Sequence, residues 1–560
     1  MESGGAEFHG TVAQVRRRRL IRRLTHLLLG VSITGWWIAG LVLHHQDKNW
    51  IVPFLVWLAV ITRLILWHVS SAHYITRPLA RFWSLLVSRS PSSVVPARWS
   101  LPVSFVVLVA LIATAAFVAP EYEEGTYYSR GMCLAGLALT MGILWLTSRH
   151  RRMVCWYTIL VGLYLQFLAA LFVLRTTVGY DIFSWLSDRA ADLLNFADEG
   201  LAFLTDSTVP TLSWFLITVA PPIVFFAALA QLLSYWGALQ WCVKKCAGFF
   251  YWALKVSGAE AVVAATSPFF GQGESVMLIK PFLCVLTKSE LHQIMCSGFA
   301  TIAGSVLVAY QKLGVSGTAL ISSCIMSIPA SIVVSKLRYP EEEETTSSEK
   351  LSLASVEDAR ETAGNWMHAF TNGAWLGVRL AGIVVAVLAC VIAGVDLVDA
   401  VLTWAGSYLN IENLTLELIF GYLFVPIAFF LGIPNKELVL VGRLIAVKLL
   451  KNEFLAYEQL QYNYDYFRLT DRSRIISTYA LCGFGNLGSL GTQVGLMTQM
   501  APSRNKDIAS VAFSAFLTGV VATITSASMV GMLLGSDTAA AMIAASKLTA
   551  PGPPPGAPPP

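Results

Sequence analysis

Apolar runs long enough to cross a lipid bilayer recur along almost the whole chain, and no other feature constrains the fold as much. Of the 560 residues, 56% are hydrophobic and 13% are charged. A helix needs about 20 consecutive apolar residues to cross the hydrocarbon core. Spans are therefore expected at 24–45, 51–69, 101–119, 131–147, 153–175, 210–240, 291–312, 316–336, 369–395, 476–500 and 506–534. We predict an all-α polytopic membrane protein with about 11 transmembrane helices, because in lipid each helix satisfies its own backbone polar groups.

The distribution of charge predicts the orientation of these spans. The first run follows the block RRRRLIRR and has no small-residue cleavage signal after it, so it is expected to be retained with the N-terminus in the cytosol. Lys and Arg gather in loops predicted to be cytosolic, at 77–98, 149–152, 244–245 and 504–506. Acidic residues gather in the predicted outer segments 120–130 and 176–209, whereas the basic cluster DRSR at 471–474 is an exception on the outside. An odd number of spans places the C-terminus outside, and we expect a multi-pass protein of the plasma membrane.

Two apolar regions, 246–287 and 413–470, are too long for one span and are interrupted by Gly, Pro and polar residues. Both are predicted to be re-entrant hairpins, because irregular backbone is tolerated at membrane depth only where protein or a watery cavity covers it. The first is expected to turn at FFGQGE and the second near LGIPNKE. Each follows an amphipathic segment, 180–196 or 396–409, and precedes a span broken by small residues. This order predicts two inverted repeats, which are typical of secondary transporters.

Polar side chains at membrane depth mark candidate sites. Gln272 and Glu274 lie in the first hairpin region, Glu453 lies in the second, and Asn486 and Ser489 share one face of a broken span. An acidic side chain near the bilayer centre costs roughly 2.5–3.5 kcal/mol on insertion scales, so Glu274 is expected to face a cavity or a partner. The alternative is that these groups satisfy freed backbone at a kink or hold helices together.

Three stretches carry a family resemblance: GQGESVMLIKPFLCVLTKSELHQIMCSGFATIAGSVLVAY, KLLKNEFLAYEQL and YALCGFGNLGSLGTQVGLMTQMAPSRNKDIAS. In order and spacing they resemble the concentrative nucleoside transporter family over about residues 179–534, and the spans before them are similar in arrangement to eukaryotic members. The resemblance implies a cation-coupled symporter for nucleosides, with no enzymatic activity, no cofactor and no nucleic-acid partner. It also implies a homotrimer in the bilayer, in which each protomer has an elevator-like transport domain built on two hairpins.

The motifs carry the family's binding residues onto this chain. Base-contacting residues fall on Gln272, Gly273, Glu274 and Val306, and ribose-contacting residues fall on Glu453, Asn486 and Ser489. An amide and a carboxylate can read the edge of a base, and one carboxylate can accept from both ribose hydroxyls. Phe484 could supply an apolar wall, although a lone aromatic in a span more often belongs to the core. Because the family commonly has Thr or Ser at Gly273, we expect room for a purine base.

The expected coupling site departs from the family pattern. Sodium-coupled members have an asparagine four residues before the glycine of GQ, where this chain has Ser267. Phe270, Thr301 and Ile302 remain as candidate ligands, but a serine is a weaker oxygen donor than an amide, and members that run on protons tend to lack the asparagine. Burial without a paired cation favours the neutral carboxyl form, so the two carboxylates at membrane depth could take up protons. We predict proton-coupled symport, with sodium coupling as the alternative and no other metal.

The chain is predicted to divide into eight segments: a basic cytosolic tail at 1–23, extra N-terminal transmembrane helices at 24–130, scaffold helices with an interfacial helix at 131–245, a first transport-domain repeat at 246–336, a cytosolic linker at 337–368, a scaffold helix with an outer interfacial helix at 369–412, a second transport-domain repeat at 413–534, and a Pro-rich tail at 535–560. Asn413 begins a sequon, NLT, whose glycosylation stays open.

Two other classes of function have only partial signals in the sequence. The stretch GVSG at 314–317 resembles the serine motif of rhomboid-type intramembrane proteases, and GYD at 179–181 resembles half of an aspartyl-protease pattern. Neither motif is completed elsewhere, so no nucleophile has an evident base. A channel would instead show polar stripes along several continuous spans.

Overall fold

The computed structural model describes residues 27–39, 54, 57–58, 60–61, 97–118, 120–122, 124–209, 215–343, 363–408, 410–411 and 414–549. The chain separates into two units, Met1–Ser100 and Leu101–Pro560. In the first unit a short apolar helix covers Leu27–Ala39. Most of the expected spans at 24–45 and 51–69, the basic tail, Asn413 and the last eleven residues lie outside the described residues. The second unit holds the elements discussed below, apart from the first turn of one helix that begins at Ala97, and its described residues are helical apart from loops and one isolated bridge, Tyr122–Gly125.

Five helices in the described part of the chain are long and apolar enough to cross a membrane. They are α5 (Tyr127–Leu146), α6 (Trp156–Arg175), α13 (Gly317–Arg338), α15 (Trp366–Tyr408) and the segment Pro502–Leu533, which contains α22 (Asn505–Leu533). A sixth span arises if α8 (Phe215–Tyr235) and α9 (Ala238–Leu254), which bend by 81°, are taken together. The sequence predicts more crossings because it also counts broken spans, whose separate helices are shorter than a bilayer requires. The protein is an all-α polytopic membrane protein.

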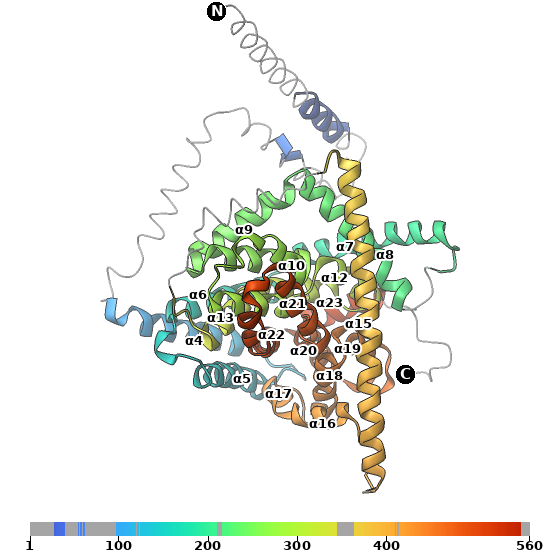
Figure 1. Ribbon diagram of the computed structural model, residues 1–560. Coiled ribbons are helices and arrows are strands. Elements are labelled where there is room, and N and C mark those ends of the chain that lie inside the picture. The colour runs from blue at the N-terminus through green and yellow to red at the C-terminus, as the bar shows by residue number, and fades with distance from the viewer. Residues whose placement is uncertain are drawn as a thin grey trace, which may run out of the picture. The chain divides into compact units, whose positions relative to one another are not determined.

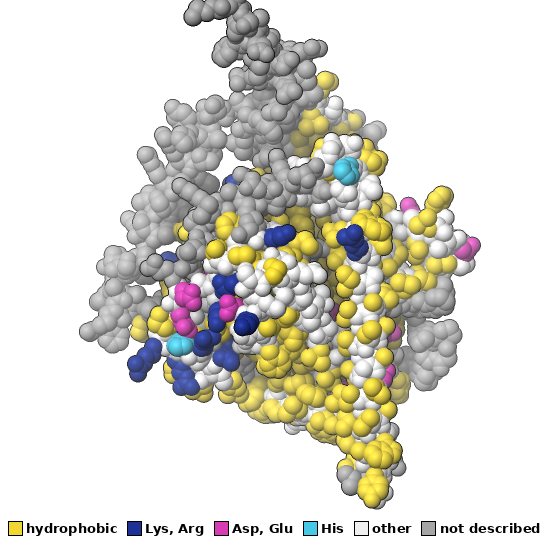
Figure 2. Space-filling view, in the orientation of Figure 1, with side chains coloured by type: hydrophobic (Ala, Val, Ile, Leu, Met, Phe, Trp, Pro, Cys, Tyr) yellow, Lys and Arg dark blue, Asp and Glu magenta, His cyan; other side chains and the backbone are white. Residues whose placement is uncertain are grey.

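α15 differs from the prediction of a span at 369–395 and a separate interfacial helix at 396–409. It is one helix of 43 residues, about 65 Å long at 1.5 Å per residue, which is about twice the thickness of the hydrocarbon core. Glycines let it pack closely along α8, since a Cβ added at Gly377 would lie 2.5 Å from the Cα of Val224. Figures 1 and 2 show α15 running along one side of the second unit, with hydrophobic side chains along most of its visible face.

The first hairpin region begins later than predicted. Residues 246–254 belong to α9, which ends where Lys255 adopts a left-handed conformation (φ 52°). α10 (Gly258–Met277) then starts with a capping box, in which Ser257 and Glu260 bond each other's backbone N–H. Gly271 interrupts α10 with φ 75° and ψ −179°, a conformation open almost only to glycine. The break therefore lies within the predicted FFGQGE stretch.

The second hairpin region turns at a different place from the one predicted. The stretch LGIPNKE is the loop between α17 (Val425–Phe430), which follows α16 (Leu416–Leu423), and α18 (Leu438–Leu450). The polar break comes later, at Lys451 and Asn452, between α18 and α19 (Glu453–Tyr462). Asn452 caps α19, because its side-chain oxygen accepts from the backbone N–H of Leu455 at 2.8 Å. In the sequence, Gly432 and Pro434 mark the loop at LGIPNKE, whereas the later break contains neither Gly nor Pro, so composition indicates the loop but not the break.

Two broken spans follow the hairpin regions. The first is α11 (Lys288–Ala300) and α12 (Gly304–Lys312), and the second is α20 (Asp471–Leu481) and α21 (Leu487–Met500). The breaks touch, since the backbone N–H of Phe484 donates to the carbonyl of Thr301 at 3.3 Å. α13 follows the first broken span and α22 follows the second, so the order of elements repeats. In Figure 1, α10, α12, α21 and α22 lie together at the centre of the second unit.

The basic cluster DRSR at 471–474, which is the exception to the expected distribution of Lys and Arg, has a packing role. Arg472, at the start of α20, is 1% exposed, and its guanidinium donates to the carbonyls of Gly432 at 2.7 Å and Gly531 at 2.8 Å. Arg474 donates to the side-chain oxygen of Gln461 at 2.9 Å. Both cations bond groups inside the protein instead of standing in a loop, so they do not report on orientation.

Three further helices complete the fold. α7 (Thr177–Leu204) contains the expected amphipathic segment 180–196. α23 (Ser536–Thr549) occupies most of the non-proline part of the segment predicted as a Pro-rich tail, and Thr538 anchors it by donating to the carbonyl of Leu174 at 3.1 Å. The remaining helix, α4 (Ala97–Phe117), covers the expected span at 101–119.

Candidate functional site

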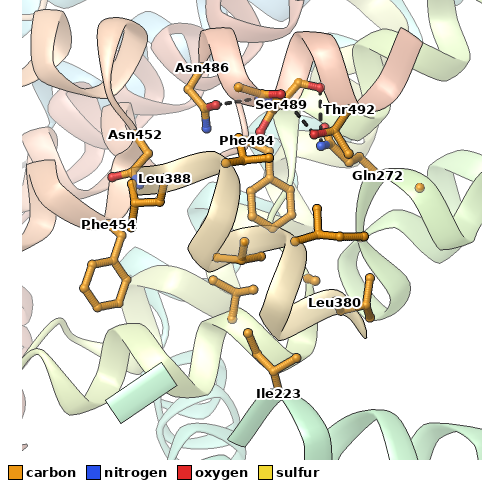
Figure 3. A pocket seen from close by; sticks show the side chains of 18 of the residues that line it. Ile223, Gln272, Leu380, Leu388, Asn452, Phe454, Phe484, Asn486, Ser489 and Thr492 are labelled. Carbon is orange, nitrogen blue, oxygen red and sulfur yellow. Dashed lines mark hydrogen bonds between the residues drawn. The ribbon is translucent and has the colours of Figure 1, made fainter. Parts of the chain in front are cut away.

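A cavity of about 230 Å³ lies where the two hairpin breaks, the two span breaks and α15 come together (Figure 3). Its apolar wall is built mainly by α15, from Leu376 to Val391, together with Val219 and Ile223 of α8. Its polar lining comes from the breaks: Gln272, Lys451, Asn452, Glu453, Asn486, Ser489 and Thr492. One side of the cavity can therefore pack against a flat apolar part of a ligand, and the other side can form hydrogen bonds with it.

Glu453 is the centre of the polar side. It is the first residue of α19, where the helix dipole favours a negative charge, and it is 5% exposed. One carboxylate oxygen accepts from the hydroxyl of Tyr310 at 2.8 Å, and the other accepts from the amide of Asn486 at 2.8 Å. The carboxylate thus ties the second hairpin to both broken spans.

Tyr310 was not among the residues predicted for the site. It lies on α12, is fully buried, and lines the same cavity as Val306. The four-residue spacing from Val306 puts the two side chains on one face of a helix, and that spacing was the signal available in the sequence.

Asn486 and Ser489 are linked at the start of α21. The side-chain oxygen of Asn486 accepts from the backbone N–H of Ser489 at 2.7 Å, which caps the helix. Because that oxygen is used, the amide nitrogen is the part of Asn486 that faces Glu453. Figure 3 shows Asn486, Ser489 and Thr492 along one edge of the cavity, with Gln272 beside them.

Gln272 brings an unsatisfied group to this edge. Its amide nitrogen makes one long contact with the carbonyl of Ser489, at 3.5 Å. Its amide oxygen is buried and has no hydrogen-bond partner among the described residues. A buried acceptor without a partner is costly and rare, so this oxygen is suited to a donor supplied by a ligand.

The other predicted binding residues also converge. Gly273, Val306 and Phe484 line the cavity, and Phe484 projects into its middle in Figure 3. Phe484 thus lines the cavity and also packs against the hydrophobic core. A Cβ added at Gly273 would lie 3.0 Å from the Leu496 side chain, so Leu496 packs closely against this glycine. Glu274 follows Gly273 in α10, and its side chain lies outside the described part of the chain.

The predicted coupling residues lie at the first hairpin and the first span break. Ser267 and Thr301 are buried, and their hydroxyls donate to the carbonyls of Val263 at 2.7 Å and Ser297 at 3.0 Å. A hydroxyl that donates its proton still has lone pairs for a cation. Phe270 lines the cavity, and Ile302 is buried within the break. In the described residues, no three His, Cys, Asp or Glu side chains are grouped so that they could hold a metal ion.

The serine of GVSG has a structural role. The hydroxyl of Ser316 accepts from the backbone N–H of Ala319 at 3.5 Å and caps α13. This position explains the residue without any nucleophilic chemistry.

A polytopic helical fold with a small-solute cavity between broken helices defines the class of membrane transporters. Three family profiles match the chain: "Na+ dependent nucleoside transporter N-terminus" at 135–208, "Nucleoside recognition" at 216–317 and "Na+ dependent nucleoside transporter C-terminus" at 319–531. Sodium/nucleoside cotransporter 1 of Oryctolagus cuniculus is 31% identical over 532 residues, which cover 92% of this chain and 78% of that protein.

Another relative and a solved structure are similar to this chain as well. Solute carrier family 28 member 3 of Rattus norvegicus is 38% identical over 73% of this chain, and the chain spans 59% of that relative's length. Among solved structures, CNTnw in an inward-facing substrate-bound state has a TM-score of 0.67 and 30% identity, with 72% of this chain and 97% of that chain covered. The chain belongs to the concentrative nucleoside transporter family, a family of transporters and not of enzymes.

Proposed function

We propose that this protein is a cation-coupled symporter that concentrates nucleosides, purine nucleosides included, by binding them in the cavity between the breaks. The observation that carries the proposal is that one cavity holds both the Glu453 carboxylate and a Gln272 amide oxygen with no hydrogen-bond partner in the described part of the chain. A base edge offers donors for the first, and vicinal ribose hydroxyls can donate to the second. Asn486 and Ser489 would complete the ribose contacts, with Gly273, Glu274 and Val306 on the base side.

The arrangement also supports an alternating-access mechanism. The polar half of the cavity belongs to the hairpins and broken spans, whereas the opposite wall belongs to the continuous helix α15. An apolar wall makes few directional bonds, so the polar half could move along it as a unit, like an elevator. We further propose a homotrimer in the plasma membrane, in which the exposed apolar face of α15, including Trp375 and Trp404, contacts lipid or a second subunit.

We propose sodium as the coupling ion, held by hydroxyl oxygens of Ser267 and Thr301 and by carbonyl oxygens of Phe270 and Ile302. The relatives and profiles are named for sodium, and none of them supports the proton coupling that the sequence favours. A proton remains the second candidate because Ser267 stands in place of the asparagine ligand and Glu453 is buried without an ion pair in the described part of the chain. Neutral oxygens suit a hard cation such as sodium.

The function is tested by uptake of labelled adenosine, guanosine, uridine and cytidine into cells that lack nucleoside transport, with each unlabelled nucleoside as competitor. A coupled transporter accumulates intact substrate above its outside concentration. Equilibration without accumulation would indicate a channel and contradict the proposal, and release of a cleaved product would indicate an enzyme.

The ion is tested by the same uptake at acidic and neutral pH, with sodium or choline outside, and with a protonophore. Strict dependence on sodium, with little effect of the protonophore, is expected. Stimulation by acid in choline, abolished by the protonophore, would instead identify the proton as the coupling ion.

A further inference from the structure

Lys448 is a buried cation that the proposed transport site does not use. It lies in the last turn of α18 and is 0% exposed. Its ammonium donates to the carbonyl of Ala480 at 2.8 Å and to the hydroxyl of Thr523 at 3.1 Å. No carboxylate forms an ion pair with it in the described part of the chain. Burying an ammonium among neutral oxygens is expensive, so its presence at membrane depth needs an explanation.

The repeat of elements gives Lys448 a counterpart. In the first hairpin, Ser267 stands five residues before Gln272, which begins the second arm after the break at Gly271. In the second hairpin, Lys448 stands five residues before Glu453, which begins α19 after the break at Lys451 and Asn452. The proposed ligand for the transported cation and the buried ammonium therefore occupy the same position in the two repeats.

The partners of Lys448 also correspond to those of a cation site. Ala480 lies in the last turn of α20, just before the second span break, as Thr301 lies at the end of α11 before the first. Carbonyls at the end of a helix lack intrahelical donors and carry the negative pole of the helix dipole. The lysine stem passes along the second break, since a Cβ added at Gly485 would lie 3.7 Å from the Cε of Lys448.

We propose that the Lys448 ammonium is a resident cation of the second repeat, bound where the first repeat binds the transported cation. The inference rests on the proposed cation-coupled function and deepens it. The resident cation holds α18 against the end of α20 and so positions Glu453, on the same hairpin, against Asn486 beyond the break. Only the first repeat then has to take a cation from solution before a nucleoside binds. Lys448 is a positioning residue, because it does not line the cavity.

The test is sodium activation of nucleoside uptake by Lys448→Gln, which removes the charge and keeps a polar, slightly shorter side chain. The half-activating sodium concentration is expected to rise roughly fivefold or more, with a steeper dependence on sodium, because a second cation must fill the vacated place. Lys280→Gln is the matched control: it removes one ammonium from the exposed side of the first hairpin region, and its sodium activation should equal that of the wild type.

A second measurement covers a variant that does not transport. The melting temperature of purified Lys448→Gln is compared with that of the wild type in sodium and in choline. Sodium should recover more of the loss than choline, whereas an equal loss in both salts would show a purely structural lysine and overturn the inference. Unchanged sodium activation in a transporting variant would overturn it as well. Failure of the wild type to concentrate nucleosides would instead overturn the proposed function.

Discussion

Replacing Glu453 with glutamine should abolish concentrative uptake while leaving the fold intact. The carboxylate accepts from Tyr310 and from Asn486, both at 2.8 Å. The introduced amide can keep both contacts, because its oxygen can accept from Asn486 and its nitrogen can donate to the oxygen of Tyr310. The substitution therefore removes the charge and keeps both contacts, with the Tyr310 hydroxyl proton as the group that loses its acceptor, and the protein should still reach the membrane.

The size of the effect follows from the bonds that a nucleoside would lose. A hydrogen bond to a charged group contributes about 1.5–3 kcal/mol, and about 1.4 kcal/mol corresponds to a factor of ten in affinity. Loss of one such bond to a ribose hydroxyl should weaken binding about tenfold to about a hundredfold. Loss of the second would take uptake at low substrate below detection.

The assay is uptake of labelled nucleoside at low concentration, corrected for the amount of protein at the cell surface. Glu458→Gln serves as the control, because it makes the same change on an exposed position of the same helix and should transport normally. Near-normal uptake by Glu453→Gln would refute the assignment of Glu453 to the ribose. A parallel loss of surface protein would show that the reasoning about an intact fold is wrong.

Three other substitutions test the geometry of the site and its support. Gly273→Ser should lower uptake of guanosine and adenosine relative to uridine, because Leu496, 3.0 Å from the added Cβ, leaves the new side chain to take up room on the proposed base side of the cavity; unchanged competition between purines and pyrimidines would contradict this. Gly271→Ala should lower the stability of the purified protein by about 1–3 kcal/mol, measured as a fall in melting temperature, because alanine is strained at φ 75°. Arg472→Met should cost about 2–5 kcal/mol in the same measurement, since it leaves two buried carbonyls without their donors; a wild-type melting temperature would rule out the guanidinium as a support of this fold.

The sequence predicts which kind of element forms better than it predicts the residues at which the element begins and ends. The mixture of Gly, Pro and polar residues at 246–287 and 413–470 correctly indicates irregular backbone, because helices cannot continue through such residues without losing hydrogen bonds. The second break was predicted near LGIPNKE but lies at Lys451 and Asn452. Neither of these residues is Gly or Pro, so the composition does not mark this break. The continuity of α15 through residues 396–408 was also missed, because Asp396 and Asp399 look interfacial, yet they bond to Lys451 at 3.2 Å and to the backbone of Leu416 at 2.6 Å.

The amino-acid sequence by itself determined the membrane class, the family, and the residues from which a nucleoside site could be built. Those properties are local: apolar length sets a span, and motifs such as GQGE and NEF carry the family resemblance from which the candidate binding residues are predicted. The tertiary structure decided which atoms meet. Tyr310 and Glu453 are separated by 143 residues, and the amide oxygen of Gln272 lacks a partner among the described residues because of how α10 packs against α21. Periodicity places a side chain on the face of a helix, but contacts across the cavity depend on how separate helices rotate and pack against one another.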